Sequence, residues 1–264
     1  MDTKQLILIT GGTSVTSIGS EKMTDNLLAA NGGIGFELAR QLLADPKKHV
    51  LLGSRSIEKG ENALKELQSQ QPKGAVEVIQ VDVASEDSVA AAAKEIENRH
   101  GRLDALVNNA GIVGGTGTNA QQLTACLQTN AVGAQLMGDY FAPLLRKSTG
   151  TPRIINVSSG AGSITVRLDR SHPRAAMKAT AYRVSKAAMN MVGACQCSEF
   201  GGEGFKIFIY GPGYTVSNLS DMNKAELGAK PTSEGTAPMV AMLNGERDED
   251  AEKYIEYGHD SFPW

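Results

Sequence analysis

The chain has 264 residues, 41% of them hydrophobic, and a formal net charge of −3, a length that suits one large α/β domain better than two small ones. The charge gives no electrostatic reason to expect nucleic acid or an anionic membrane as a partner, and no apolar run approaches the ~18 residues of a membrane span. The first residues lead into an apolar strand without a secretory-signal pattern, so we expect a cytoplasmic protein.

The sequence contains three cysteines and four histidines. The cysteines are Cys126, Cys195 and Cys197, and the histidines are His49, His100, His172 and His259. An odd number of cysteines without a framework spacing indicates no disulfide scaffold. The histidines lack the spacing typical of metal ligands, so we expect no metal site.

The first predicted element is a buried strand over residues 6–10, because a short continuous apolar run is typical of a parallel sheet covered on both faces. Gly11 follows, but a helix over 36–44 comes only after an 18-residue segment, 12–29. Without that segment the text reads Thr-Gly-Ala-Asn-Gly-Gly-Ile-Gly. Glycines between a strand and a helix let the backbone approach a pyrophosphate that rests on the helix N-terminus. The candidate loop residues are Gly11, Asn31, Gly33, Ile34 and Gly35.

The intervening segment shows no apolar periodicity, and two origins are open. One hypothesis is a translated, unspliced intron: codons for residues 12–14 can hold a donor site, those for 23–25 a branch point, and those for 29–30 a terminal CAG. The alternative is a genuine surface insertion, since closing a loop of about 18 residues costs on the order of 2.5 kcal/mol. Transcripts that always contain the segment would exclude the intron.

A second strand, 49–53, ends in Ser54-Arg55-Ser56, with no acidic residue before Glu58. A carboxylate at this place would accept the adenosine 2′-hydroxyl of NAD, whereas an arginine with small hydroxyls accommodates a 2′-phosphate. The pattern therefore favours NADP(H) over NAD(H). The alternative is a solvated arginine at a strand end.

Further strands and helices alternate along the chain, and their ends carry polar residues. A helix over 58–70 precedes a strand over 76–81 that ends in Asp82-Val83, where Asp82 is equally well placed to cap the next helix, 86–99. A strand over 103–107 then delivers Asn108-Asn109-Ala110-Gly111 to the carboxyl edge of the sheet, the usual ligand-binding edge. One helix is predicted over 123–146, with Asn130 in it, and a strand over 153–157 delivers Ser158 and Ser159.

A long helix predicted over 178–199 carries Tyr182 and Lys186. Four residues is just over one helical turn, so the two side chains stand on the same face. A phenol has a pKa of about 10, but a nearby ammonium lowers it, and the pair can then exchange a proton with a carbonyl or alcohol oxygen. In isolation, Tyr-x-x-x-Lys would be a surface pair.

The last predicted strand, 205–210, ends in a Gly-Pro-Gly turn. Residues 218–235 are small and polar, and we expect them to form a mobile substrate lid. The basic segment 165–180, which separates Ser159 from Tyr182, can cover the substrate site or remain a solvated loop.

Taken together, the glycine loop, Asn-Asn-Ala-Gly, Ser159 and Tyr182-x-x-x-Lys186 resemble the short-chain dehydrogenase/reductase family, in particular its carbonyl-reductase-like members. The resemblance runs from Leu6 to Trp264, apart from the interruption, and implies a single-domain, Rossmann-type doubly wound parallel sheet. It implies that Tyr182 is the general acid/base and that Lys186 lowers its pKa and holds the nicotinamide ribose. Ser159, with Ser158 as the alternative, would orient the carbonyl, and Asn130 would complete the proton path.

The resemblance also implies a set of cofactor contacts for NADP(H), preferred over NADH. They are Gly11, Asn31, Gly33, Ile34, Gly35, Arg55, Asp82, Val83, Asn109, Tyr182, Lys186, Pro212, Gly213 and Thr215. The expected function is interconversion of a small-molecule ketone or aldehyde and an alcohol by hydride transfer. The alternative is a catalytically disabled NADP-binding or interaction protein, because the phosphate loop is interrupted. Assembly into a homo-oligomer is left open.

Overall fold

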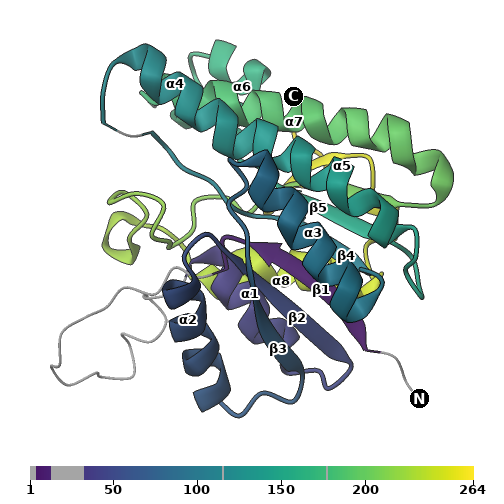
Figure 1. Ribbon diagram of the computed structural model, residues 1–264. Coiled ribbons are helices and arrows are strands. Elements are labelled where there is room, and N and C mark those ends of the chain that lie inside the picture. The colour runs from purple at the N-terminus through teal and green to yellow at the C-terminus, as the bar shows by residue number, and fades with distance from the viewer. Residues whose placement is uncertain (1–3, 13–32, 115, 177) are drawn as a thin grey trace, which may run out of the picture.

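The computed structural model describes residues 4–12, 33–114, 116–176 and 178–264, and these form an α/β fold around one parallel sheet (Figure 1). The strand order is β3-β2-β1-β4-β5-β6-β7, and every neighbouring pair is parallel. The strands are β1 (Gln5–Thr10), β2 (Lys48–Ser54), β3 (Ala75–Gln80), β4 (Ala105–Asn108), β5 (Arg153–Val157), β6 (Lys206–Gly211) and β7 (Tyr254–Glu256). The order reverses between β1 and β4, which is the point where doubly wound sheets bind ligands.

Helices cover both faces of the sheet (Figure 1). They are α1 (Ile34–Leu42), α2 (Ile57–Ser69), α3 (Glu86–His100), α4 (Asn119–Leu127), α5 (Gly133–Leu145), α6 (Ile164–Leu168), α7 (Thr180–Phe200) and α8 (Thr232–Asn244). One core joins the sheet to α3 and α5, and the other joins it to α1, α2 and α8. Successive residues of β1 alternate between the two cores, Leu6 and Leu8 in one and Ile7 and Ile9 in the other. This double burial explains why the strand reads as a continuous apolar run.

The sequence prediction of the architecture is confirmed, and most elements lie within two residues of their expected bounds. The prediction of a single helix over 123–146 is wrong, because a π-helical turn, Gln128–Val132, separates α4 from α5. The expected lid, 218–235, is too long, since α8 begins at Thr232 and buries Thr232 and Gly235. The short elements α6 and β7 were not expected. No helix in the described part of the chain has the length and apolar character needed to cross a bilayer.

The segment proposed as an interruption, 12–29, and the loop candidate Asn31 lie outside the described residues, apart from Gly12. The described chain on either side of the gap converges. A Cβ added at Gly35 would lie 3.0 Å from Gly12 Cα, and the Gly12 amide donates to Gly53 O at 3.3 Å. The described chain therefore stops before the gap and resumes after it at one place, beside the end of β1.

Candidate active site

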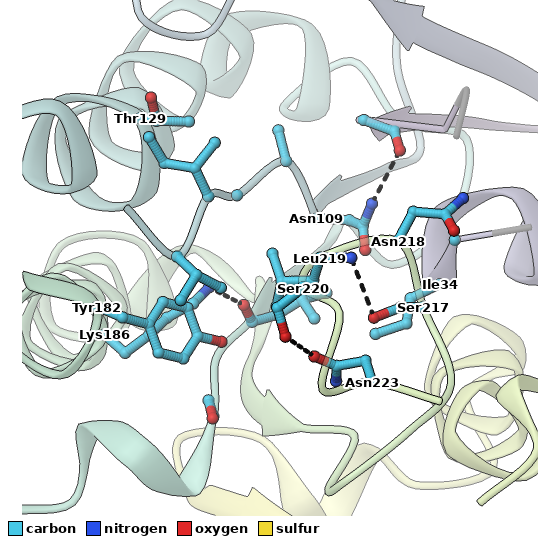
Figure 2. A pocket seen from close by; sticks show the side chains of 18 of the residues that line it. Ile34, Asn109, Thr129, Tyr182, Lys186, Ser217, Asn218, Leu219, Ser220 and Asn223 are labelled. Atoms are coloured by element: carbon cyan, nitrogen blue, oxygen red, sulfur yellow. Dashed lines mark hydrogen bonds between the residues drawn. The ribbon is translucent and has the colours of Figure 1, made fainter. Parts of the chain in front are cut away.

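A cavity of about 1250 Å³ opens at the carboxyl ends of the strands, around the switch point between β1 and β4 (Figure 2). Thirteen of the predicted site residues line it: Gly11, Gly33, Ile34, Arg55, Asp82, Val83, Asn109, Ser159, Tyr182, Lys186, Pro212, Gly213 and Thr215. Gly35 and Asn130 stand behind the wall and contact lining residues. The ends of six strands, β1 to β6, together with α1 and α7, therefore deliver the predicted residues to one place.

The glycines after β1 are required by close backbone approach. Gly11 has φ +66°, and a Cβ there would lie 2.9 Å from Ala110 Cα. A Cβ at Gly35 would lie 2.6 Å from Asn109 Nδ2. Gly33 precedes the nine-residue helix α1, and no described side chain caps the start of this helix. The first N–H groups of α1 are therefore available to an anion in the cavity.

Asparagines tie the strand ends together beneath this loop. Asn109 donates from Nδ2 to Thr10 O at 2.9 Å, and its backbone amide donates to Thr10 Oγ1 at 3.0 Å. Asn108 donates to Asn156 Oδ1 at 2.9 Å and so joins β4 to β5. The two residues fix the edge of the sheet on which the cavity rests.

The end of β2 forms a basic corner of the cavity. Arg55 lines it and is exposed, and Lys59, in the first turn of α2, lines it too. Ser56 caps α2 by accepting from the Lys59 amide at 3.4 Å. Lys59 was missed from the sequence, although its place one turn after a strand-end arginine was a usable signal. Asp82 lines the next strand end and accepts from the Ala84 amide at 3.0 Å, while Ser85 is the cap of α3.

Tyr182 stands in the cavity wall, 6% exposed, and Ser159 lines the cavity beside it. Burial raises the pKa of Tyr182 to about 12; the nearby Ser159 hydroxyl lowers it, and Glu256 raises it further. Burial outweighs every other contribution to this pKa, and the expected lowering by Lys186 stays a prediction. At neutral pH the phenol is fully protonated.

Lys186 is 4% exposed and lies beside Tyr182 on α7, with Nζ 5.8 Å from the centre of the phenol ring (Figure 2). Its ammonium donates to Val157 O at 2.7 Å, at the end of β5. Burial lowers the pKa of Lys186 to about 8. The pKa values of Tyr182 and Lys186 therefore shift in opposite directions, and each shift favours the neutral form of the side chain.

The two serines after β5 differ in their surroundings. Ser158 is buried, and its hydroxyl donates to Asn190 Oδ1 inside the fold. Both serines line the cavity, and the Ser159 carbonyl accepts from the Tyr254 hydroxyl at 2.7 Å. This arrangement favours Ser159 over Ser158 as the residue that meets a substrate, and it adds Tyr254 of β7 as a support that the sequence pattern did not indicate.

Asn130 is fully buried in the π-helical turn between α4 and α5. Its Oδ1 accepts from the Ile112 amide and its Nδ2 donates to Ile112 O, both at 2.8 Å, and Nδ2 also donates to Ser185 Oγ at 2.8 Å. The widened turn presents this amide to the loop after β4 and to α7 at once. π-Helical turns of this kind are frequent at functional sites.

Two segments line the outer wall of the cavity, and the end of the chain packs behind it. Pro173 and Lys178 of the basic segment line the cavity, which supports a covering role for that segment. Tyr214, Leu219 and Met222 line it from the loop before α8. At the chain's end, Ser163 Oγ and the Thr165 amide donate to Trp264 O at 3.3 and 2.9 Å, and the Trp264 ring packs on Tyr254 at 5.3 Å.

The fold and the cavity at its switch point define a Rossmann-type protein. The sequence pattern of the family described as "short chain dehydrogenase" matches residues 27–227. "Short-chain dehydrogenase anuI" of Penicillium roqueforti is 33% identical over 266 residues, covering 97% of this chain and 98% of the relative. "Short-chain dehydrogenase/reductase eupG" of Phoma sp is 36% identical over 251 residues, covering 84% and 90%.

Among solved structures, the NADPH-bound carbonyl reductase from chicken fatty liver has the same fold, with a TM-score of 0.76 at 23% identity over 99% of this chain and 100% of that one. The chain belongs to the short-chain dehydrogenase/reductase family of oxidoreductases.

Proposed function

We propose that the protein is an NADP(H)-dependent oxidoreductase that interconverts a ketone or aldehyde and an alcohol. The observation that carries the proposal is the buried Tyr182 side chain, which lines the cavity together with Ser159, with Lys186 one turn along the same helix. A positioned phenol, a hydroxyl and an amine are the groups that proton transfer to a carbonyl oxygen needs.

Three features support a nicotinamide dinucleotide phosphate in the same cavity. Gly11 and Gly35 leave the backbone bare where a Cβ would clash, beside the uncapped N-terminus of α1. Arg55 and Lys59 stand where an adenosine 2′-phosphate would lie, with no acid at the end of β2. Two structures of the same fold are described as complexes with NADPH or NADP. The cofactor, when bound, supplies the hydride.

The chain's own residues supply position and protons. Ser159 holds the carbonyl oxygen by hydrogen bonding, and Tyr182, protonated at neutral pH, donates its proton to that oxygen. Lys186 and Asn130 line the route by which the phenol regains a proton, since both lie beside Gly111: a Cβ there would be 3.3 Å from Asn130 Oδ1 and 3.7 Å from Lys186 Nζ. A phenol with a raised pKa suits reduction, because the acid form is the one present.

The test is a titration of the intact chain with NADPH and NADH, followed by nicotinamide fluorescence, beside a version that joins Gly11 directly to Ala30. Tight NADPH binding and ketone reduction by the intact chain support the proposal and make the segment 12–29 a tolerated insertion. Binding by the joined version alone would make the chain as written a disabled form. Binding by neither version would overturn the cofactor assignment.

A further inference from the structure

Two histidines and a glutamate meet near the start of β2, at the end of the strands opposite the active site. His49 is the second residue of β2, Glu77 lies in β3, and His100 is the last residue of α3. In the β2–β3 register Leu51 pairs with Glu77, so His49 and Glu77 lie on the same face of the sheet, two residues apart along the strand. That face is the one covered by α3, because Leu51 shares a core with Val89 and Ile96. The fold thus brings His100 over the other two.

The side-chain atoms that can bind a metal converge. His49 Nε2 lies 2.6 Å from Glu77 Oε1, and His100 Nε2 lies 3.8 Å from Glu77 Oε2. One ligand atom from each residue lies within 4.8 Å of the other two. The imidazoles stand perpendicular with centres 5.3 Å apart, and both Nε2 atoms are buried without a hydrogen bond of acceptable geometry to any described residue. Two buried nitrogens aimed at one carboxylate are an arrangement that a shared cation would satisfy.

The electrostatic surroundings keep the imidazoles in the form that binds metal. Burial, and then the charges of Lys4, Arg99 and Arg102, lower the pKa of His49, and burial also lowers that of His100. Nearby positive charges repel a metal ion, but two of them form ion pairs within the described chain. Arg99 pairs with Glu77 and Glu95, and Arg102 pairs with Asp104 at 3.3 Å. Arg99 approaches Glu77 Oε2 and so leaves Oε1 on the side of His49.

We propose that His49, Glu77 and His100 form a binding site for a divalent transition metal, with Zn²⁺ as the best fit. Two imidazole nitrogens and one carboxylate oxygen suit zinc and its borderline neighbours rather than calcium or magnesium. A cavity of about 210 Å³, lined also by Lys4, Leu6 and Arg102, opens beside the histidines and gives room for a water as the fourth ligand. The ion would join β2, β3 and α3, and its role would be structural, since the proposed active site lies at the other edge of the sheet.

The test is calorimetric titration of the full, tag-free chain with ZnCl₂ after chelation, with visible absorption on Co²⁺ addition as a second readout. The variants are H49Q, E77Q and H100Q, and the matched control is H259Q, which changes an exposed histidine outside the cluster. All are made on a C195S background, because the exposed Cys195 thiol can itself bind zinc.

The expected result is one Zn²⁺ per chain, an affinity at least about tenfold lower in each cluster variant, and no change in H259Q. Zinc should also raise the melting temperature of the parent and not that of E77Q, because a ligand stabilises only the state that binds it. Stoichiometry and affinity that are the same in E77Q, H100Q and H259Q, or no binding by the parent, would overturn the proposal. Neither result depends on cofactor binding or turnover, so the proposed function is tested separately.

Discussion

Tyr182 and Lys186 are buried in the cavity wall, and this burial decides their protonation more than their proximity does. The phenol becomes a weaker acid and the ammonium a stronger one. The pair therefore begins a catalytic cycle with a proton on the tyrosine and a lysine that can lose its own near neutral pH. For each residue the consequence can be measured on its own.

Replacing Tyr182 by Phe removes the proposed proton donor while keeping the ring. We expect kcat for ketone reduction to fall about 10²–10⁴-fold with NADPH affinity nearly unchanged, because general acid catalysis contributes on that order. The control is Y214F, which removes another hydroxyl at the cavity and should leave kcat within a few-fold. Equal losses in the two variants would contradict the role of Tyr182.

Lys186 makes stability depend on pH with a definite sign. Its pKa is about 8 in the fold, below the ordinary 10.5, so between these values the unfolded chain binds more protons and stability rises with pH. From pH 7 to 9.5 the gain should be on the order of 2 kcal/mol. Urea unfolding at both pH values should show this gain in the parent relative to K186M, whose side chain does not titrate. An equal pH response in both proteins would exclude a buried, titrating lysine.

Arg55 and Lys59 should set cofactor preference. Each ionic hydrogen bond to a phosphate contributes on the order of 1.5–3 kcal/mol, so R55A and K59A should each weaken NADPH binding by at least about tenfold. NADH, which lacks the 2′-phosphate, should bind as before. Fluorescence titration measures both affinities. The matched control is K94A, which removes a surface cation from the exposed face of α3. Loss of NADH affinity in R55A would place the arginine elsewhere in the site.

At the scale of elements, the π-helical turn between α4 and α5 connects the loop after β4 to α7 through one amide. Removing that amide in N130A leaves buried partners on Ile112 and Ser185 unsatisfied, at about 1–3 kcal/mol for each group. We expect the free energy of unfolding to fall by about 2–4 kcal/mol and kcat to fall with it. Denaturant unfolding and steady-state kinetics check this, with T129A as the adjacent control. An unchanged unfolding midpoint would contradict the account.

The elements that sequence reasoning could predict are those whose signal is local. The inner strands read as apolar runs, and α7 follows from its length and from the Tyr-x-x-x-Lys spacing. The π-helical turn was not predictable, because one extra residue in a turn leaves the apolar spacing nearly intact. Helix α8 follows Pro231 and contains Gly235 and Pro238, a composition typical of a loop, and its packing against α1 overrides that tendency.

The residues of the candidate site also divide into those that the sequence could predict and those that it could not. Ser159, Tyr182 and Lys186 could be predicted because a family pattern carries them. Lys59 was missed although its place one turn after Arg55 was a usable signal, whereas Tyr254 could not be predicted, since it reaches the cavity region through β7 rather than through a motif. The histidine cluster was invisible for a related reason: His49 and His100 are far apart in the sequence, and the β2–β3 register and the length of α3 bring them together.

At the scale of the whole molecule, the C-terminal residues support Ser159, the serine proposed to hold the carbonyl oxygen. Phe262 and Trp264 pack on Tyr254, whose hydroxyl donates to Ser159 O. Deleting residues 261–264 removes this packing and the acceptor for Ser163 and Thr165 at α6. We expect kcat to fall about tenfold or more through misplacement of Ser159, since small errors in position at a reacting centre are costly.

The matched control for this deletion is D260A, a change at an exposed side chain just before the deleted residues. Steady-state kinetics and near-UV circular dichroism report on both variants. Wild-type kcat in the truncated protein would show that the tail is a passive cover.

The positions of the two chain ends bear on how the protein should be handled at the bench. An affinity tag after Trp264 would extend from a residue that packs against the support of Ser159, so activity measured on such a fusion would include its effect. A polyhistidine tag at the other end would enter the fold near Lys4, which lines the small cavity beside His49 and His100, and would bring extra imidazoles to the proposed zinc ligands. Purification with a cleavable N-terminal tag, removed before any metal is added, avoids both errors.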